Sequence, residues 1–294
     1  MVPKIGLALG GGGSRGSYQI GVLRALEEAG ILKEIEHVAG SSIGAINTMM
    51  VMAKFSFDRM IETWETITNE DVYGHHFDHL QFSKVGIFSL KELFDRLTKQ
   101  ISLKEIRDSK IQGYVTATKI RKGSMIEQVM LHRMEKEVFH LNNFNHPYKA
   151  VLASASIPLI FGSTEIDESF YVDGGIKDNC PVDVLIEQGC NIILAIPIDG
   201  RFHPKMYEDS PILLINFETK KLFSIILLDI LDFKKEGVKD NADYGYLIGK
   251  HMIEKLKHEG IFDGLHWHID DKFQHIFMTK DEEKHLDKGE DVWN

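Results

Sequence analysis

The sequence lacks the cysteines and the long apolar segments that are typical of secreted or membrane-spanning proteins. Its 294 residues include two cysteines, Cys180 and Cys190, which stand on either side of an expected helix and do not suggest a disulfide framework. No uninterrupted apolar run approaches the length of a membrane-spanning helix, and the run at residues 5–9 is too short for the core of a signal peptide. We therefore expect a cytoplasmic protein that is either soluble or peripheral at a membrane.

Positive charge is also scarce. Lysine and arginine number 34 against 44 aspartates and glutamates, which gives a formal net charge of -10. This balance disfavours a nucleic-acid partner and any general attraction to anionic membranes, so a lipid surface would have to be met through a local patch. The hydrophobic content of 43% is ordinary for a globular protein with a sizeable core. Composition leaves the oligomeric state open.

What the sequence does contain is the pattern of strand, glycine-containing turn and helix, twice in succession. Residues 5–9 form an apolar run that ends in glycines, as expected for a strand buried on both faces of a parallel sheet. The next residues place apolar side chains on one helical face, and Gly30 ends that helix. A second short strand ends at Ala39, and residues 43–54 are expected to form the helix behind it. Two such units predict a doubly wound α/β fold.

The rest of the chain is expected to continue this fold. Strands are predicted at residues 114–120, 170–172, 191–196 and 212–217, and helices at residues 55–69, 90–100, 182–188, 222–233 and 242–256. Residues 70–86 are interpreted as a surface excursion, and the charged residues 280–294 as peripheral. The apolar segment from Leu222 to Phe233 is bracketed by lysine pairs, so it is either a buried core helix or an interfacial helix at a membrane.

Residues 40–44, with the sequence GSSIG, have the spacing of a nucleophile elbow. Gly40 and Gly44 stand two residues before and after Ser42, where larger side chains would collide across a sharp turn between strand and helix. The turn would lift the Ser42 hydroxyl out of the sheet and place it at a helix N-terminus, where partial positive charge favours a developing oxyanion. Ser42 is therefore the candidate nucleophile, and Ser41 is its neighbour.

Four consecutive glycines follow the first strand, within residues 10–16 (GGGGSRG). The N–H groups of Gly11, Gly12 and Gly13 can turn toward one point, which makes them the candidate oxyanion donors. Arg15 either adds positive potential or orients the loop. The segment that ends at Gly16 also fits the dinucleotide pattern Gly-x-Gly-x-x-Gly, but the second strand leads into the nucleophile elbow instead of an acid that would bind a ribose. A dinucleotide-binding enzyme is thus the lesser alternative.

The sequence Asp173-Gly174-Gly175 follows an expected strand and supplies a carboxylate. An aspartate with its ordinary pKa of about 3.9 is a weak proton acceptor near neutrality. Gly174 and Gly175 allow close approach of the backbone, and the apolar residues before Asp173 favour its desolvation, which would raise that pKa. Asp173 is therefore the candidate general base.

Together these segments resemble the signature blocks of the patatin-like phospholipases. The matching residues are 11–16 (GGGSRG), 40–44 (GSSIG) and 173–175 (DGG), and residues 153–158 (ASASIP) with Phe161 resemble the stretch that precedes the aspartate in this family. The likeness covers about residues 4–200. It implies a three-layer α/β/α sandwich with a mainly parallel sheet. It also implies cleavage of fatty acyl esters of phospholipids or other lipids by a Ser42–Asp173 dyad, without cofactor or metal.

Beyond residue 200 no family motif is found. We therefore expect residues 1–200 to form the catalytic core and residues 201–294 to be an extension that completes the same domain. The lipid ester is the expected partner, and contact with a membrane or micelle through residues 222–233 is a further expectation.

Three other arrangements are weighed against this hypothesis. A non-catalytic lipid-binding pseudoenzyme is disfavoured because Ser42, Asp173 and the glycine loop are all intact. A metal site at residues 75–79 (HHFDH) is disfavoured because hydrolysis by a serine needs no metal. A Ser-His-Asp triad is the minor alternative, and seven histidines follow Asp173 in the required order, namely His203, His251, His258, His266, His268, His275 and His285.

Overall fold

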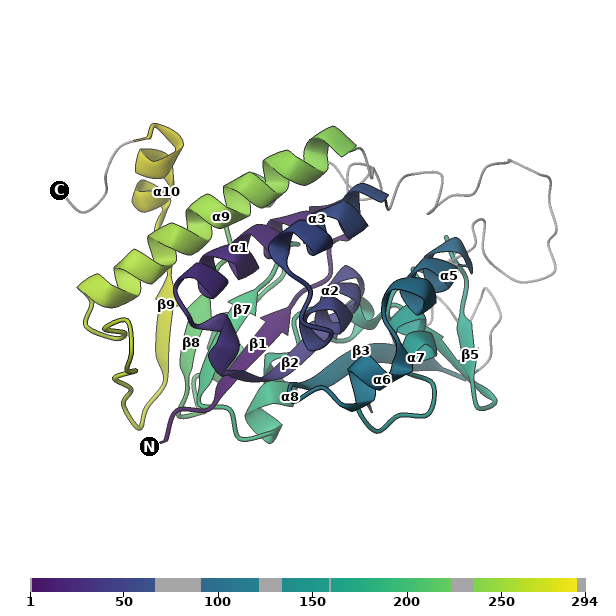
Figure 1. The fold of residues 1–294 in the computed structure, drawn as a ribbon. Coiled ribbons are helices and arrows are strands. Elements are labelled where there is room, and N and C mark those ends of the chain that lie inside the picture. Colours follow the sequence, from purple (N-terminus) through teal and green to yellow (C-terminus); the bar gives the residue numbers. More distant parts are fainter. Residues whose placement is uncertain (1, 67–90, 122–133, 159, 224–234, 290–294) are drawn as a thin grey trace.

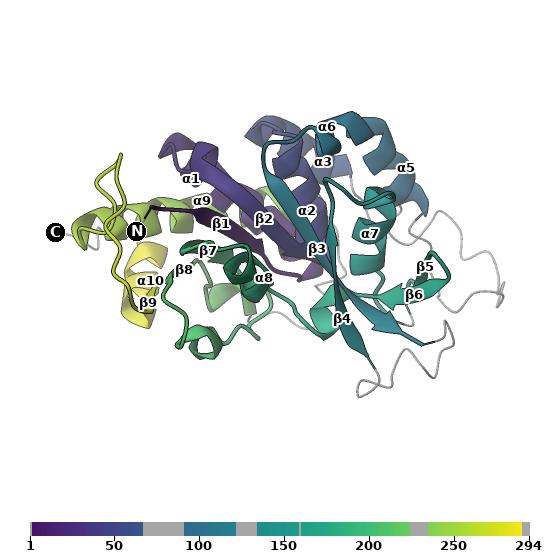
Figure 2. The ribbon, with the colours of Figure 1, turned by 90° about the horizontal axis from the view of Figure 1, so that it is seen from below.

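The computed structural model describes residues 2–66, 91–121, 134–158, 160–223 and 235–289. Within these ranges nine strands form one mixed sheet, and helices lie on both sides of it (Figure 1, Figure 2). The predicted α/β sandwich is confirmed.

The parallel part of the sheet has the order β3-β2-β1-β7-β8-β9. Its strands are β1 (Ile5–Leu9), β2 (Ile35–Ser41), β3 (Gln112–Ile120), β7 (Ile192–Ile196), β8 (Leu213–Asn216) and β9 (Gln274–Phe277). The antiparallel strands are β4 (Glu135–His140) and β6 (Ser169–Val172), which both pair with β3, and β5 (Thr164–Ile166), which pairs with β6. The carboxyl ends of the parallel strands share one edge of the sheet, which is where open α/β sheets build their sites.

Side chains of the central strands alternate between two apolar layers. Leu7 and Leu9 belong to the layer formed with α1, α2, α7 and α9, whereas Ala8 and Ala39 face the short helix α8. Figure 1 shows α1, α3 and α9 on one side of the strands and α8 on the other. The helices are α1 (Gly16–Glu28), α2 (Ile43–Met52), α3 (Phe57–Thr66), α5 (Lys91–Gln100), α6 (Leu103–Arg107), α7 (Pro147–Ser154), α8 (Val182–Glu187), α9 (Lys235–His258) and α10 (Lys280–Asp287).

The predicted strands are all present, with ends that differ by a few residues. Strands β4, β5 and β9 and helices α6 and α7 were not predicted, because their short sequences mix charged and apolar residues without a clear period. Helix α9 begins at Lys235 instead of residue 242. Residues 67–90 and 224–234 lie outside the described residues, and with them the expected surface excursion and nearly all of the apolar segment that begins at Leu222. Leu222 itself is buried in a short 3-10 helix, Lys221–Phe223.

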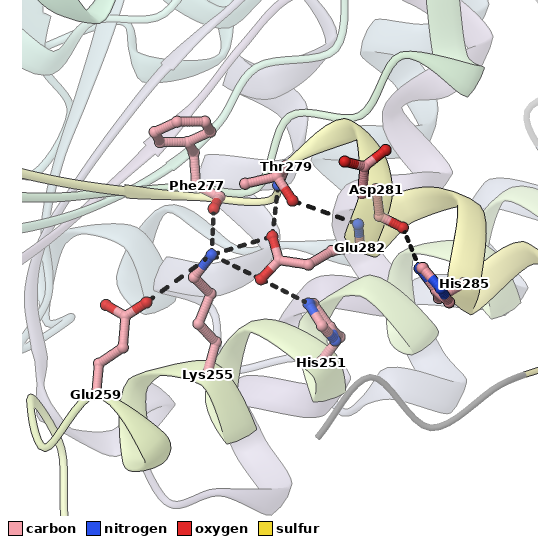
Figure 3. Close-up of polar contacts among 8 residues, drawn as sticks. All are labelled: His251, Lys255, Glu259, Phe277, Thr279, Asp281, Glu282 and His285. Atoms are coloured by element: carbon pink, nitrogen blue, oxygen red, sulfur yellow. Dashed lines mark hydrogen bonds and ion pairs between the residues drawn. The ribbon is translucent and has the colours of Figure 1, made fainter. Parts of the chain in front are cut away.

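A buried lysine on α9 holds β9 and α10 to that helix (Figure 3). Lys255 Nζ donates to the Phe277 carbonyl at 2.9 Å and to Glu282 Oε1 at 2.8 Å. The second carboxylate oxygen of Glu282 accepts the Thr279 N–H at 2.6 Å in a capping box that starts α10. Residues expected to be only peripheral thus include a helix anchored to the core. Because β8 and β9 also pair in the common sheet, we propose that residues 201–294 complete one domain with the rest.

Candidate active site

The candidate nucleophile and base meet because two strands approach each other head to head along one edge of β3. β2 pairs with residues 112–116 of β3 and β6 pairs with residues 118–120, while β4 occupies the opposite edge. Since β2 is parallel to β3 and β6 is antiparallel, both strands run toward the gap between Thr116 and Thr118. Ser42 follows the end of β2, and Asp173 follows the end of β6.

Ser42 lies on a strained turn between β2 and α2. Its backbone angles are φ 53° and ψ -123°, a conformation that costs a side-chain-bearing residue about 1–3 kcal/mol. Glycine is required on both sides, because a Cβ on Gly40 would lie 2.3 Å from the Gly44 carbonyl oxygen, and one on Gly44 would lie 2.1 Å from that of Leu9. The Ser42 N–H donates to Ser154 Oγ at 2.8 Å. The predicted elbow is therefore present in the fold, and Ser42 is 8% exposed at its tip.

Asp173 is fixed by hydrogen bonds on every side. Ser42 Oγ donates to its Oδ2 at 2.6 Å, and the Gly175 N–H donates to its Oδ1 at 2.8 Å. Its own N–H donates to the Ser156 carbonyl at 2.8 Å, and Thr118 Oγ1 donates to the Asp173 carbonyl at the same distance. The carboxylate is thus held against the serine by groups from β3 and from the segment after α7.

The electrostatic environment suits Asp173 to proton transfer. Burial raises the pKa of Asp173 to about 6, because the charged carboxylate loses its hydration. The hydrogen bonds from Ser42 and Gly175 and the positive charge of Arg201 oppose this rise in the pKa, and the negative charge of Asp199 adds to it. Arg201 and Asp199 form an ion pair with each other in the segment after β7. The carboxyl group is therefore ionised at neutral pH yet more basic than an exposed aspartate.

The glycine loop between β1 and α1 lies directly beside the serine. A Cβ on Gly11 would lie 2.8 Å from Ser42 Cβ, which places the loop next to the nucleophile. The Gly11 N–H, however, donates to the Asn179 carbonyl at 3.0 Å, while Asn179 Nδ2 donates back to the Gly11 carbonyl at 2.9 Å. In the described part of the chain, the N–H groups of Gly12 and Gly13 have no such acceptor. Of the three expected oxyanion donors, Gly11 thus already has its N–H bonded within the fold, which leaves the N–H groups of Gly12 and Gly13.

The remaining motif residues pack around the glycine loop and Asp173. Arg15 is buried, and its Nη1 donates to the Ile198 carbonyl at 3.4 Å, a contact that favours its role in orienting the loop. Gly16 begins α1 at a point where a Cβ would meet Trp64. Gly174 packs close to the backbone of β3, and Gly175 supplies the N–H that binds Asp173.

Several residues that surround the candidate site were not predicted from the sequence. Ser154 and Ser156 lie in the stretch that resembles the family, but nothing in that stretch indicated which backbone groups they would contact. Asn179 follows the Asp-Gly-Gly segment by a few residues, and its side chain closes the gap to Gly11. No local pattern pointed to Asp199 or Arg201, because their effect on Asp173 depends on where the segment after β7 passes.

Within the described ranges, no histidine takes part in this site. All seven histidines after Asp173 are described, and none of them hydrogen-bonds to Ser42 or Asp173. His251 instead faces Glu282, and His266 and His268 face Asp263.

The two ligand alternatives concern a metal site at residues 75–79 and a dinucleotide site at the end of β2. Residues 75–79 lie outside the described residues, and the described ranges contain no group of three or more potential metal ligands. Cys180 and Cys190 are both free and buried. Where a dinucleotide site would present a ribose-binding acid, β2 ends in Ser41 and Ser42.

None of the described helices is both long and apolar enough to cross a membrane.

A serine on a strained elbow, hydrogen-bonded to a buried carboxylate beside a glycine loop, is an arrangement typical of serine-dependent acyl hydrolases. A family model described as patatin-like phospholipase matches residues 7–186. The chain therefore belongs to the patatin-like phospholipase family, as the sequence motifs predicted.

Comparison with curated proteins identifies distant relatives. Lysophospholipase NTE1 of Candida glabrata is 28% identical over 226 residues, which cover 70% of this chain and 11% of that protein. The protein of the same name from Saccharomyces cerevisiae is 27% identical, with 70% and 12% covered. An uncharacterized NTE family protein of Mycobacterium bovis is 27% identical over 198 residues, which cover 67% of this chain and 50% of that protein. The chain thus spans about a tenth of the fungal relatives and half of the mycobacterial one.

Among solved structures, VipD from Legionella pneumophila matches with a TM-score of 0.46 and 13% identity, covering 86% of this chain and 67% of that chain. The ExoU–SpcU complex of Pseudomonas aeruginosa matches with a TM-score of 0.40 and 18% identity, covering 86% of this chain and 52% of that chain.

Proposed function

We propose that the protein hydrolyses fatty acyl esters of phospholipids or related lipids, with Ser42 as the nucleophile and Asp173 as the general base. The 2.6 Å hydrogen bond from Ser42 Oγ to Asp173 Oδ2 is the observation that carries the proposal. The lipid part of the proposal is supported by family membership and by the fungal relatives that are named lysophospholipases.

In the first half-reaction, Asp173 accepts the proton of Ser42 as Oγ attacks the carbonyl carbon of the ester. The carbonyl oxygen becomes an oxyanion, which the N–H groups of Gly12 and Gly13 stabilise, and each such donor typically lowers the barrier by about 3–4 kcal/mol. The bond between the carbonyl carbon and the leaving oxygen then breaks. Asp173 returns the proton to the departing alcohol, and the acyl group stays on Ser42.

In the second half-reaction, water takes the place of the alcohol. Asp173 accepts a proton from the water as its oxygen attacks the acyl carbon, and the same donors stabilise the second oxyanion. The bond to Ser42 Oγ breaks, Oγ regains a proton from Asp173, and the fatty acid is released. No cofactor is consumed in either step.

The raised pKa of Asp173 explains how an aspartate can serve without a histidine. A general base works best when its pKa lies close to the operating pH, because it must be ionised and still bind a proton in the transition state. A pKa of about 6 meets both conditions near neutrality. The mechanism therefore depends on the burial of Asp173 as much as on its position.

The proposal is tested by labelling with a fluorophosphonate probe and mapping the modified residue by mass spectrometry. We expect modification at Ser42, none at that position in Ser42→Ala, and much slower labelling of Asp173→Asn, which keeps the nucleophile but lacks the base. Modification at a different serine, at an unchanged rate in Ser42→Ala, would overturn the assignment. Lipid binding without any labelling would favour the pseudoenzyme.

A further inference from the structure

An apolar cavity lies at the end of the sheet opposite the candidate active site. Its volume is about 460 Å³, and its walls come from the ends of α1 and α2, from α3, and from the residues that precede β2 and β3. Ile35 lines this cavity at the first position of β2, whereas Ser42 follows the last position. A strand of this length separates the two by about 20 Å. The cavity is therefore distinct from the catalytic dyad.

Three lysines and one carboxylate stand around the cavity. Lys33, Lys54 and Lys110 all line it, together with Glu27, and their side chains are exposed. Within the described ranges, none of these four side chains forms an ion pair or a hydrogen bond. A local excess of positive charge on a chain with a net charge of -10 provides an unpaired site for an anionic group.

The floor of the cavity is apolar. Ile35, Val51, Phe55 and Met60 are buried residues that line it, and the half-buried Leu32 borders them. An aliphatic chain placed here would leave water for a hydrocarbon surface, which is favourable by roughly 25 cal/mol for each Å² buried.

Backbone carbonyl groups at the helix ends beside this cavity already accept hydrogen bonds from the protein. The Leu26 carbonyl at the end of α1 accepts the Ile31 N–H at 2.9 Å. At the end of α2, the Met50 carbonyl accepts the Phe55 N–H at 3.1 Å, and Met52 accepts a hydrogen bond from Ser109. Because these acceptors are already used, the charged groups of the cavity that are available to a ligand are the three lysine ammonium groups and the Glu27 carboxylate.

From this combination we infer that the cavity binds a single-chain amphiphile with an anionic head, with its aliphatic chain on the apolar floor and its carboxylate or phosphate among Lys33, Lys54 and Lys110. The volume lies within the range of about 300–1,000 Å³ that is usual for small-ligand pockets. A fatty acid released from Ser42 is such a molecule. This last link rests on the proposed function, whereas the binding site does not.

The site is tested by lysine footprinting of the Ser42→Ala protein, which removes turnover from the measurement. The protein is acetylated with an N-hydroxysuccinimide ester in the presence of decanoate or decyl phosphate below its micellar concentration, or of decanol below its solubility limit. The modified lysines are quantified by mass spectrometry. We expect decanoate to slow acetylation of Lys33, Lys54 and Lys110, and to leave the exposed Lys205 and Lys239 unchanged. Protection by decyl phosphate alone would support the anionic site and exclude the fatty-acid product as its ligand.

Variants with equal changes in charge give the second measurement. The triple variant K33Q/K54Q/K110Q removes the cavity lysines, and K205Q/K239Q/K288Q removes the same charge from exposed positions elsewhere. Decanoate affinity, measured by calorimetry, should fall at least about tenfold in the first variant, the loss expected when a charge-assisted contact is removed, and stay unchanged in the second. Equal protection by decanol and decanoate, or unchanged decanoate affinity in the first variant, would overturn the inference. Neither result depends on catalysis, so failure here leaves the fluorophosphonate result untouched.

Discussion

Replacing Asp173 with asparagine should stabilise the folded protein while removing its proposed general base. The pKa of Asp173 rises from 3.8 to about 6 on burial, which corresponds to a free energy of about 3 kcal/mol against the charged form. Asparagine is neutral and close to aspartate in shape, and its side-chain oxygen can still accept the Gly175 N–H. At pH 7.5 we therefore expect the free energy of unfolding to increase by about 3 kcal/mol.

The pH dependence of this gain follows from the sign of the shift. Because the folded pKa of Asp173 lies above the unfolded value, the charged carboxylate destabilises the fold fully above about pH 6, and this cost fades as the pH falls toward the unfolded pKa. The advantage of Asp173→Asn should accordingly shrink to about 1 kcal/mol at pH 4.5. A loss of hydrogen bonding alone would show no such dependence on pH.

The assay is denaturant unfolding of both proteins at pH 7.5 and pH 4.5, followed by circular dichroism. Asp209→Asn serves as the matched control, because Asp209 is exposed and its replacement should change stability by less than about 0.5 kcal/mol. A variant less stable than the wild type at pH 7.5, or a gain of equal size at both pH values, would refute the reasoning about burial.

Four further predictions concern activity. The acid limb of kcat/KM should titrate near pH 6, the pKa of Asp173. It should move to higher pH in Arg201→Gln and to lower pH in Asp199→Asn, because the charge of Arg201 lowers the pKa of Asp173 and that of Asp199 raises it. Shifts of both variants in the same direction would contradict this prediction. Ser42→Ala should abolish hydrolysis of a short-chain aryl ester with an unchanged circular dichroism spectrum, and adding Asp173→Asn should cost little more, because the two residues act as a unit. Gly12→Val crowds the segment after β7 and should lower kcat more than it raises KM in steady-state kinetics, whereas the opposite pattern would assign the loop to ground-state binding. Single replacement of each histidine after Asp173 should leave substantial activity, and one histidine whose loss matched Ser42→Ala in a folded protein would exclude the dyad.

Much of the candidate site could be predicted from short segments, since the features that identify them are local. The elbow at residues 40–44 is recognisable because a sharp turn tolerates only glycine at two of its positions, and those glycines lie in backbone contact in the fold. The strands that precede the loop, the elbow and Asp173 were predicted because each contains a short run of apolar residues, at 5–9, 38–39 and 170–172. Strand β4 was missed because an edge strand with charged residues does not need such a run.

The sequence by itself determined the chemical groups, namely a serine on a strained turn, a glycine loop and a carboxylate between apolar residues and glycines. Only the tertiary structure decided that Ser42 and Asp173, which are 131 residues apart, share a hydrogen bond, because that contact requires β2 and β6 to end head to head on the same edge of β3. It also decided that the Gly11 N–H donates to the Asn179 carbonyl, and that burial raises the pKa of Asp173 to about 6. Hydrogen bonding and desolvation depend on every segment that surrounds a group, and most of those segments are distant in the sequence.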